Sequence, residues 1–136
     1  MNTKDKEIIL NKVQVNCTAI RKVLDTKVSN DDIVGVTDKL ISLVEIAGLA
    51  SYTEAIAKAV YEDELGSALE TLGEAYPDKG STILTQMAKG RVSSYMSAVV
   101  YSERLGRNIS HAQDALRSVI SLQKEELSQS KFGTQT

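Results

Sequence analysis

Apolar residues recur along this chain at alternating spacings of three and four, the repeat of helices that pack against other helices. The longest run lies between residues 91 and 127. Only one proline, Pro77, occurs in 136 residues, so little in the sequence interrupts long helices. Aromatic residues make up 4% of the chain, and no stretch alternates for long as a β-strand does. The pattern therefore predicts an all-α protein.

Three expected helices carry these seams. The first, expected over residues 4–28, has its seam at Leu10, Val13, Cys17, Ile20 and Leu24. The second, expected over 32–73, has one seam at Val36, Leu40, Leu43, Ala47 and Ala50 and another apolar flank at Ile41, Val44, Tyr52, Ile56 and Val60. Two apolar flanks are typical of a central helix between two neighbours. The last helix has its seam at Tyr95, Ala98, Ser102, Leu105, Ile109, Ala112, Leu116 and Val119.

Turn and capping residues set the boundaries of the first two helices. Ser29 or Asn30 is expected to cap the second helix, because short polar side chains accept hydrogen bonds from the first free backbone N–H groups. Gly66 weakens that helix enough for us to expect a break near it. The sequence Tyr76–Gly80, YPDKG, combines proline, aspartate and glycine in the order that favours a turn.

The last helix is expected from Ser81 or Thr82, acting as its cap, to about Ser128, with a kink or split at Gly90. Residues 129–136 are polar and lack periodicity, so we expect a disordered tail there. Residues 1–128 would then form one helical domain, an elongated bundle of three to four long helices. Such a chain buries little core on its own, and we expect homo-oligomerisation to complete it.

Charge is distributed unevenly, although the net charge is only −2. Residues 1–30 hold six Lys or Arg and three Asp or Glu, residues 31–78 hold two and eleven, and residues 79–124 hold seven and two. Basic flanks around an acidic middle favour charge pairing within the chain or between subunits. The alternative is a basic surface for an anionic polymer.

The expected compartment is cytoplasmic. The single cysteine, Cys17, excludes an intrachain disulfide framework and lies on an apolar seam, so we expect a buried thiol in a reducing environment. The N-terminal segment MNTKDKEIIL has no apolar run typical of a signal peptide. No segment reaches the apolar length of about 20 residues that spans a bilayer, so no membrane association is expected.

A search for catalytic and metal-binding residues finds no constellation. His111 has arginines at helical spacing and no Cys or His at ligand spacing, so a surface position is expected. Consecutive residues of a helix point about 100° apart, so Glu62, Asp63 and Glu64 are expected to form a solvated face. The glycines match no nucleotide-binding loop. We expect no enzyme, no cofactor and no metal.

A basic set on the last expected helix is the remaining candidate for function. Its members, which would contact phosphates without base specificity, are Lys89, Arg91, Arg104, Arg107, Arg117 and Lys124. Tyr95 and Tyr101 could stack on unpaired bases, although Tyr95 lies on the seam and packing is the simpler interpretation for both. The structural alternative is a solubilising face whose cations pair with neighbouring acids.

The segment Tyr101–Leu127 of this helix carries a family resemblance. Leu116-Arg117-Ser118, Ile120-Ser121 and Lys124-Glu125 resemble the C-terminal pattern of small phage-encoded helical proteins. Within that group the chain is similar to the UvsY-type recombination mediators. The resemblance implies a ring-like oligomer that binds single-stranded DNA and helps a partner protein, a recombinase, to load.

The sequence therefore leads to one functional hypothesis and two alternatives. The first is a non-enzymatic phage accessory protein in DNA recombination or replication that binds single-stranded DNA and a partner protein. The second is an oligomeric assembly protein in virion assembly or DNA packaging, such as a small terminase subunit or an adaptor. The third is a host-interaction or anti-defence protein that binds a protein or a small ligand in a pocket between helices.

Overall fold

The computed structural model describes residues 1–133, of which the side chains are described to residue 130. Four helices make up this part of the chain: α1 (Thr3–Leu24), α2 (Ile33–Ala75), α3 (Ser81–Arg91) and α4 (Ser93–Gly133). The prediction of an all-α protein is confirmed. None of these helices combines the length and the apolar character that crossing a bilayer requires.

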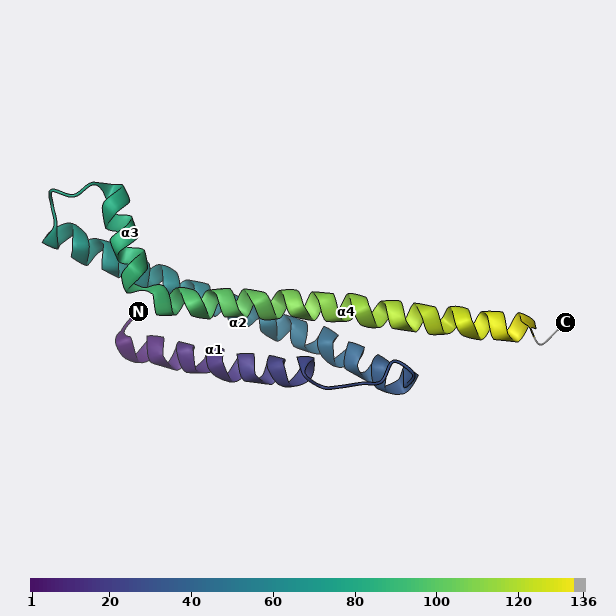
Figure 1. Ribbon diagram of the computed structural model, residues 1–136. Helices are drawn as coiled ribbons and strands as arrows, with labels where there is room; N and C mark the ends of the chain where they lie inside the picture. Colours follow the sequence, from purple (N-terminus) through teal and green to yellow (C-terminus); the bar gives the residue numbers. More distant parts are fainter. Residues whose placement is uncertain (134–136) are drawn as a thin grey trace.

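The helices form an elongated arrangement with α2 at its centre (Figure 1). The long helix α2 runs antiparallel to α1 and to α4 and contacts both. The short helix α3 lies at one end, where the chain turns from α2 into α4. At the other end α4 continues past the loop that joins α1 to α2.

The core lies where the predicted seams of three helices meet. Its buried members are Val13, Cys17 and Ile20 of α1, Leu43, Ala50 and Ala57 of α2, and Val99, Leu105 and Ile109 of α4. They include members of each predicted seam and confirm the buried position of Cys17, whereas Ile41, Val44 and Tyr52 of the second predicted flank are exposed. Burial raises the pKa of the Cys17 thiol, while a hydrogen bond with Ser102 acts in the opposite direction.

Both expected N-caps of the second helix are wrong, because Asp32 fills this role. Its carboxylate accepts the N–H of Gly35 at 3.0 Å, so the helix begins just beyond it, at Ile33. A Cβ at position 35 would collide with that carboxylate, which explains glycine there. Lys39 of α2 reaches the end of α1, where its Nζ donates to the carbonyls of Leu24 at 3.1 Å and Thr26 at 2.7 Å.

The expected break near Gly66 does not occur, and α2 is one helix of 43 residues. Val60 and Leu72, on either side of Gly66, are both fully buried, so tertiary packing holds the helix through the glycine. The turn predicted at Tyr76–Gly80 is confirmed. Neither Ser81 nor Thr82 caps α3, because Gly80 occupies the N-cap position without a side chain.

The split expected at Gly90 lies two residues later, at Val92. Val92 is buried, and its backbone leaves the helical region with φ −103° and ψ 18°, so α3 ends and α4 begins in a new direction. The tail expected to be disordered from residue 129 is helical as far as Gly133, because no proline or glycine precedes that position in it. Residues 134–136 of that tail lie outside the described residues.

A matched pair of leucine substitutions tests the importance of the core. Leu43 is fully buried beneath α1 and α4, so Leu43→Ala should lower the free energy of unfolding by about 2–5 kcal/mol. Leu122 is 57% exposed on α4, and Leu122→Ala should change the same quantity by less than about 0.5 kcal/mol. Urea denaturation followed by circular dichroism measures both, and equal losses would contradict the described core.

Candidate nucleic-acid interface

An open groove lies where α2, α3 and α4 meet. It encloses about 670 Å³ and is lined by Tyr61 of α2, Lys89 of α3 and six residues of α4, namely Ser93, Met96, Ser97, Val100, Tyr101 and Arg104. Two of its lining residues, Lys89 and Arg104, belong to the predicted basic set. The groove thus brings together two cations and two tyrosines from three helices.

The helical repeat and the break at Val92 explain how these residues meet. Ser93, Ser97, Val100 and Arg104 follow one another at spacings of four, three and four, so they share one side of α4. The chain changes direction at Val92, and α3 therefore presents Lys89 to the beginning of this side. If the helix continued straight through Val92, Lys89 and Arg104 would lie on one straight helix, and the groove between α3 and α4 would not exist.

The groove is electropositive. Neither Lys89 nor Arg104 takes part in an ion pair within residues 1–133, and no carboxylate appears among the lining residues. Both residues are exposed. Two cations without a counter-charge, held near aromatic rings in an open groove, are suited to an anionic group that also carries a flat, unsaturated ring.

Tyr101 connects this groove to α1. Its side chain is 41% exposed, and its hydroxyl accepts a hydrogen bond from Arg21 Nη1 of α1 at 3.5 Å. Arg21 also lies 3.4 Å from the carboxylate of Asp25, so a third cation stands beside the ring with its charge partly balanced. Tyr95, the other tyrosine considered from the sequence, is half-buried and does not line the groove.

The other four members of the predicted basic set are exposed, but they lie apart from this groove. Arg91 is the last residue of α3. Arg107 lines a different groove together with Glu54 and Glu103. Arg117 lies 3.6 Å from Asp114 of the same helix, and Lys124 follows farther along α4. The six cations of the predicted basic set are therefore divided among several surfaces.

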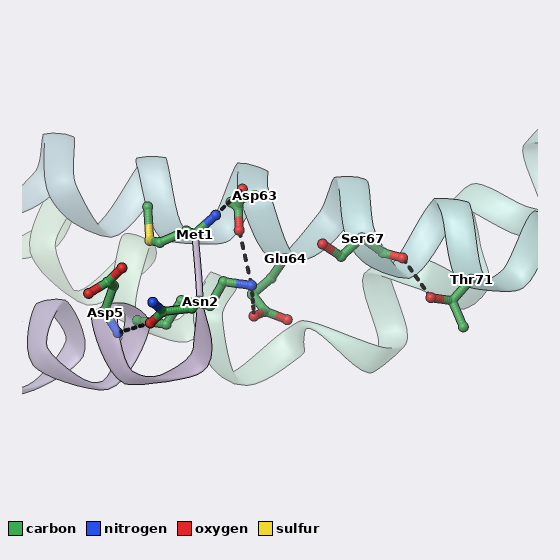
Figure 2. A network of polar contacts seen from close by, with 8 residues as sticks. Met1, Asn2, Asp5, Asp63, Glu64, Ser67 and Thr71 are labelled. Atoms are coloured by element: carbon green, nitrogen blue, oxygen red, sulfur yellow. Dashed lines mark hydrogen bonds and ion pairs between the residues drawn. The ribbon is translucent and has the colours of Figure 1, made fainter.

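The acidic cluster at residues 62–64 is not simply a solvated face, and that expectation is corrected. Lys6 Nζ lies 3.0 Å from Asp63 and 2.5 Å from Glu64, and the N-terminal amine lies 3.9 Å from Asp63 (Figure 2). A cation from α1 can approach between two consecutive side chains of α2. These contacts hold the start of α1 against α2. At the start of α1, the side chain of Asn2 also caps the helix by accepting the N–H of Asp5.

These contacts shift the ionisation of both partners. Hydrogen bonds to Glu64 and then to Asp63 raise the pKa of Lys6 above its ordinary value. The hydrogen bond from Lys6 lowers the pKa of the Asp63 carboxyl. Lys58 likewise has a raised pKa, chiefly because it hydrogen-bonds Glu54 and also contacts Glu103 of α4. Three carboxylates of the acidic middle, Glu54, Asp63 and Glu64, are thus paired by lysines outside the predicted basic set.

No group of three or more His, Cys, Asp or Glu side chains suited to a metal ion occurs in the described part of the chain. His111 is exposed on α4, outside the groove.

The spacing of residues along each helix did not predict two residues at this site, Tyr61 and Arg21. Tyr61 belongs to α2 and Arg21 to α1, so each meets Tyr101 or its groove across the bundle. Spacing identifies the residues that share one face of a helix, but it does not give the register between two helices. The only signal present was a basic side chain directly after a seam position, since Arg21 follows Ile20.

Comparison with known proteins adds no relative: no protein-family model matches this chain, and neither the curated proteins nor the solved structures contain a match.

The network around Lys6 gives a prediction with a defined pH dependence. The lowered pKa of Asp63 stabilises the fold above the unfolded value of about 3.9, and this contribution is lost as the pH falls through the lower folded value. The raised pKa of Lys6 stabilises the fold below about 10.4 and loses its effect above the higher folded value. Lys6→Met should therefore lower the urea midpoint at neutral pH, and the difference should shrink as the pH falls below the unfolded carboxyl value of about 3.9.

Lys4→Met is the matched control, because Lys4 is exposed on the same helix and has no ion pair within residues 1–133. Its urea midpoint should follow that of the unmodified protein across the pH range. A Lys6→Met difference that persists unchanged into acid would show that the lysine stabilises by packing alone.

Proposed function

We propose that this chain is a non-enzymatic accessory protein that binds single-stranded DNA in the groove between α2, α3 and α4. The observation that supports this proposal best is the pairing of Lys89 and Arg104, both without a carboxylate partner, with Tyr61 and Tyr101 in one open groove. The cations would contact phosphates, and the exposed face of Tyr101 would stack on a base.

The proposal favours single strands for a physical reason. In a duplex each base face is covered by the next base pair, so an aromatic side chain can stack only on bases that are unpaired. Backbone contacts by Lys and Arg carry no sequence information, and we therefore expect binding without base specificity. The groove itself presents hydroxyls and cations but no paired nucleophile and base, which supports a binding role over a catalytic one.

The proposed process is phage DNA recombination or replication, in the cytoplasm of an infected cell. Tyr101 and Arg104 lie both in the groove and within Tyr101–Leu127, the segment that carries the resemblance to UvsY-type mediators. A mediator of that kind would also form a homo-oligomer and contact a recombinase. The remaining exposed cations of α4, Arg107, Arg117 and Lys124, would then extend the DNA path or face the partner protein.

An oligomeric assembly protein for virions or DNA packaging is the second candidate. It is favoured by the large exposed surface, 9026 Å² for a 14.8 kDa chain, where a globular monomer of this mass exposes about 7,000 Å². This candidate predicts a ring of defined size that forms equally well without nucleic acid. Light scattering on the purified protein, with and without an oligonucleotide, separates it from the first candidate.

Salt dependence tests the role of the groove cations. The double substitution Lys89→Ala and Arg104→Ala removes both cations of the groove, and should weaken binding to a labelled oligothymidylate. The slope of log affinity against log salt should become shallower by about 1.4, since each lost phosphate contact removes about 0.7 on single strands. Fluorescence anisotropy between about 50 and 200 mM salt measures both quantities.

A charge-matched control uses Lys22→Ala with Lys27→Ala, two exposed lysines near the end of α1. This pair changes the net charge equally and should leave the salt slope close to that of the unmodified protein. An equal loss in the two doubles would point to general charge rather than the groove. No binding at low salt by the unmodified protein would overturn the proposal.

Substitutions of Tyr101 test stacking separately from charge. Tyr101→Leu removes the aromatic face and should weaken binding about tenfold, since stacking on one base contributes about 1–3 kcal/mol. Tyr101→Phe keeps the ring and loses only the hydrogen bond from Arg21, so its affinity should stay close to that of the original. The same anisotropy assay applies, with circular dichroism as the check on folding, and similar losses in both variants would argue against stacking.

A further inference from the structure

One face of α2 is apolar and exposed, with Lys12 of α1 at its edge. The outer face, as we name it, consists of Ile41, Val44, Gly48, Tyr52, Ala55 and Ala59, all of them exposed. Ile41 is 51% exposed, Val44 53% and Tyr52 47%. The spacing of Ile41, Val44 and Tyr52 predicted an apolar flank that faces a neighbouring helix. In the described chain, however, α1 and α4 cover only the opposite side of α2.

The chain exposes enough surface to accommodate a partner on this face. The chain exposes 9026 Å², which exceeds the expectation for a globular monomer of its mass by about 2,000 Å². A stable protein interface covers about 800 Å² on each partner, so a two-copy contact fits well within the excess. Between residues 33 and 59 the sector that contains the outer face holds no charged side chain, which also distinguishes it from an ordinary solvated surface.

We propose that the outer face pairs with the outer face of a second copy of this chain, with the two α2 helices antiparallel and a two-fold axis at Gly48. This inference rests on the oligomeric part of the proposed function and names its interface. A closed two-fold contact uses the same patch on both copies, as the outer face requires.

Side-chain size favours the antiparallel arrangement. An axis at position 48 places Ile41 of one copy opposite Ala55 of the other, and Val44 opposite Tyr52. The large Ile41 before Gly48 then lies opposite the small Ala55 after it. Tyr52 is the exception, because it is large and lies opposite Val44. A parallel pair would place Ile41 on Ile41 and Ala55 on Ala55, leaving the two helices far apart at one end and loosely packed at the other.

Gly48 itself supports a close approach by another helix. A glycine inside a helix is unfavourable relative to alanine, and no atom of this chain would lie within 4 Å of a Cβ added there. Packing within one copy therefore does not require glycine at this position. A second helix crossing at Gly48 would explain it, because two backbones approach most closely where neither carries a side chain.

Charge at the edge of the outer face is complementary in the same arrangement. Lys12 of α1 stands over its own Tyr52, with Nζ 3.4 Å from the hydroxyl and 5.7 Å from the ring centroid. Pairing positions 44 and 52 brings Glu45 of the other copy to this edge. Glu45 is exposed and has no ion pair within residues 1–133, so each copy supplies one cation and one carboxylate to the contact.

A matched pair of charge substitutions tests the interface in the absence of nucleic acid. Sedimentation equilibrium should give a dimer for the unmodified protein, and Val44→Glu should raise the dimer dissociation constant at least a hundredfold. Val15→Glu is the control, because Val15 is 67% exposed on α1, and it should remain dimeric. A monomer at every concentration for the unmodified protein would overturn the proposal, as would dissociation by both variants alike.

Disulfide trapping tests the axis. Gly48→Cys should cross-link rapidly into a covalent dimer on oxidation, because the two Cα atoms meet at the axis within disulfide reach. Ala55→Cys should not, since its two copies would lie about 20 Å apart along the helices. The buried Cys17 gives the background in the unmodified protein. Cross-linking at 55 and not at 48 would overturn the antiparallel arrangement.

The outcome is independent of DNA binding, because every readout is taken without an oligonucleotide. A dimer that does not bind single strands would remove the DNA proposal and keep this interface. A strictly monomeric protein that binds single-stranded DNA would remove this interface and keep the DNA proposal.

Discussion

The burial of one narrow strip on α2 beneath both α1 and α4 holds the whole bundle together. The strip consists of Leu43, Ala50 and Ala57, with exposed fractions of 0%, 4% and 1%. Two of its three members are alanine, so neighbouring helices approach closely on both sides of a single helix. The three helices therefore share one continuous core along α2. Larger side chains at Ala50 or Ala57 would separate α1 from α4 and move Tyr101 away from Arg21.

Periodicity was sufficient to predict the helices and the core, because both depend on residues three or four apart in one segment. The seam through Val13, Cys17 and Ile20 is buried as its spacing requires. The interruptions were harder to predict, since they depend on competition between local preference and tertiary packing. At Gly66 the helix continues, because the burial of Val60 and Leu72 outweighs the low helix propensity of glycine. At Val92 the helix breaks, although the residue there is neither glycine nor proline.

The candidate site was predictable only in part, for the same physical reason. Lys89 and Arg104 were identified as cations on a polar face, but Tyr61 joins them across the bundle. Spacing within one helix does not determine which residues of another helix lie opposite. Charge composition was also incomplete as a guide. Three carboxylates of the acidic middle, Glu54, Asp63 and Glu64, pair with Lys58 and Lys6 and not with the cations at the corner of α3 and α4.

The proposed DNA groove and the outer face of α2 lie on different surfaces, and they are compatible in one molecule. Tyr61, in the groove, lies 13 residues along α2 from Gly48. In the antiparallel dimer the two grooves would be separated by about 40 Å along the helices. One strand could then contact both, and the effective concentration of the second groove would strengthen binding without a new contact.

The projecting end of α4 has a consequence for the local stability of the chain. The side chain of Gln123 donates to the carbonyl of Asn30 in the loop between α1 and α2, and beyond it α4 continues alone (Figure 1). Leu127 on this projecting end is 71% exposed. An isolated helix of this length is only marginally stable in water. Amide protons there should exchange through fraying of a few turns, while those near Leu105 exchange only when the bundle opens, so one continuous helix spans two separate cooperative units.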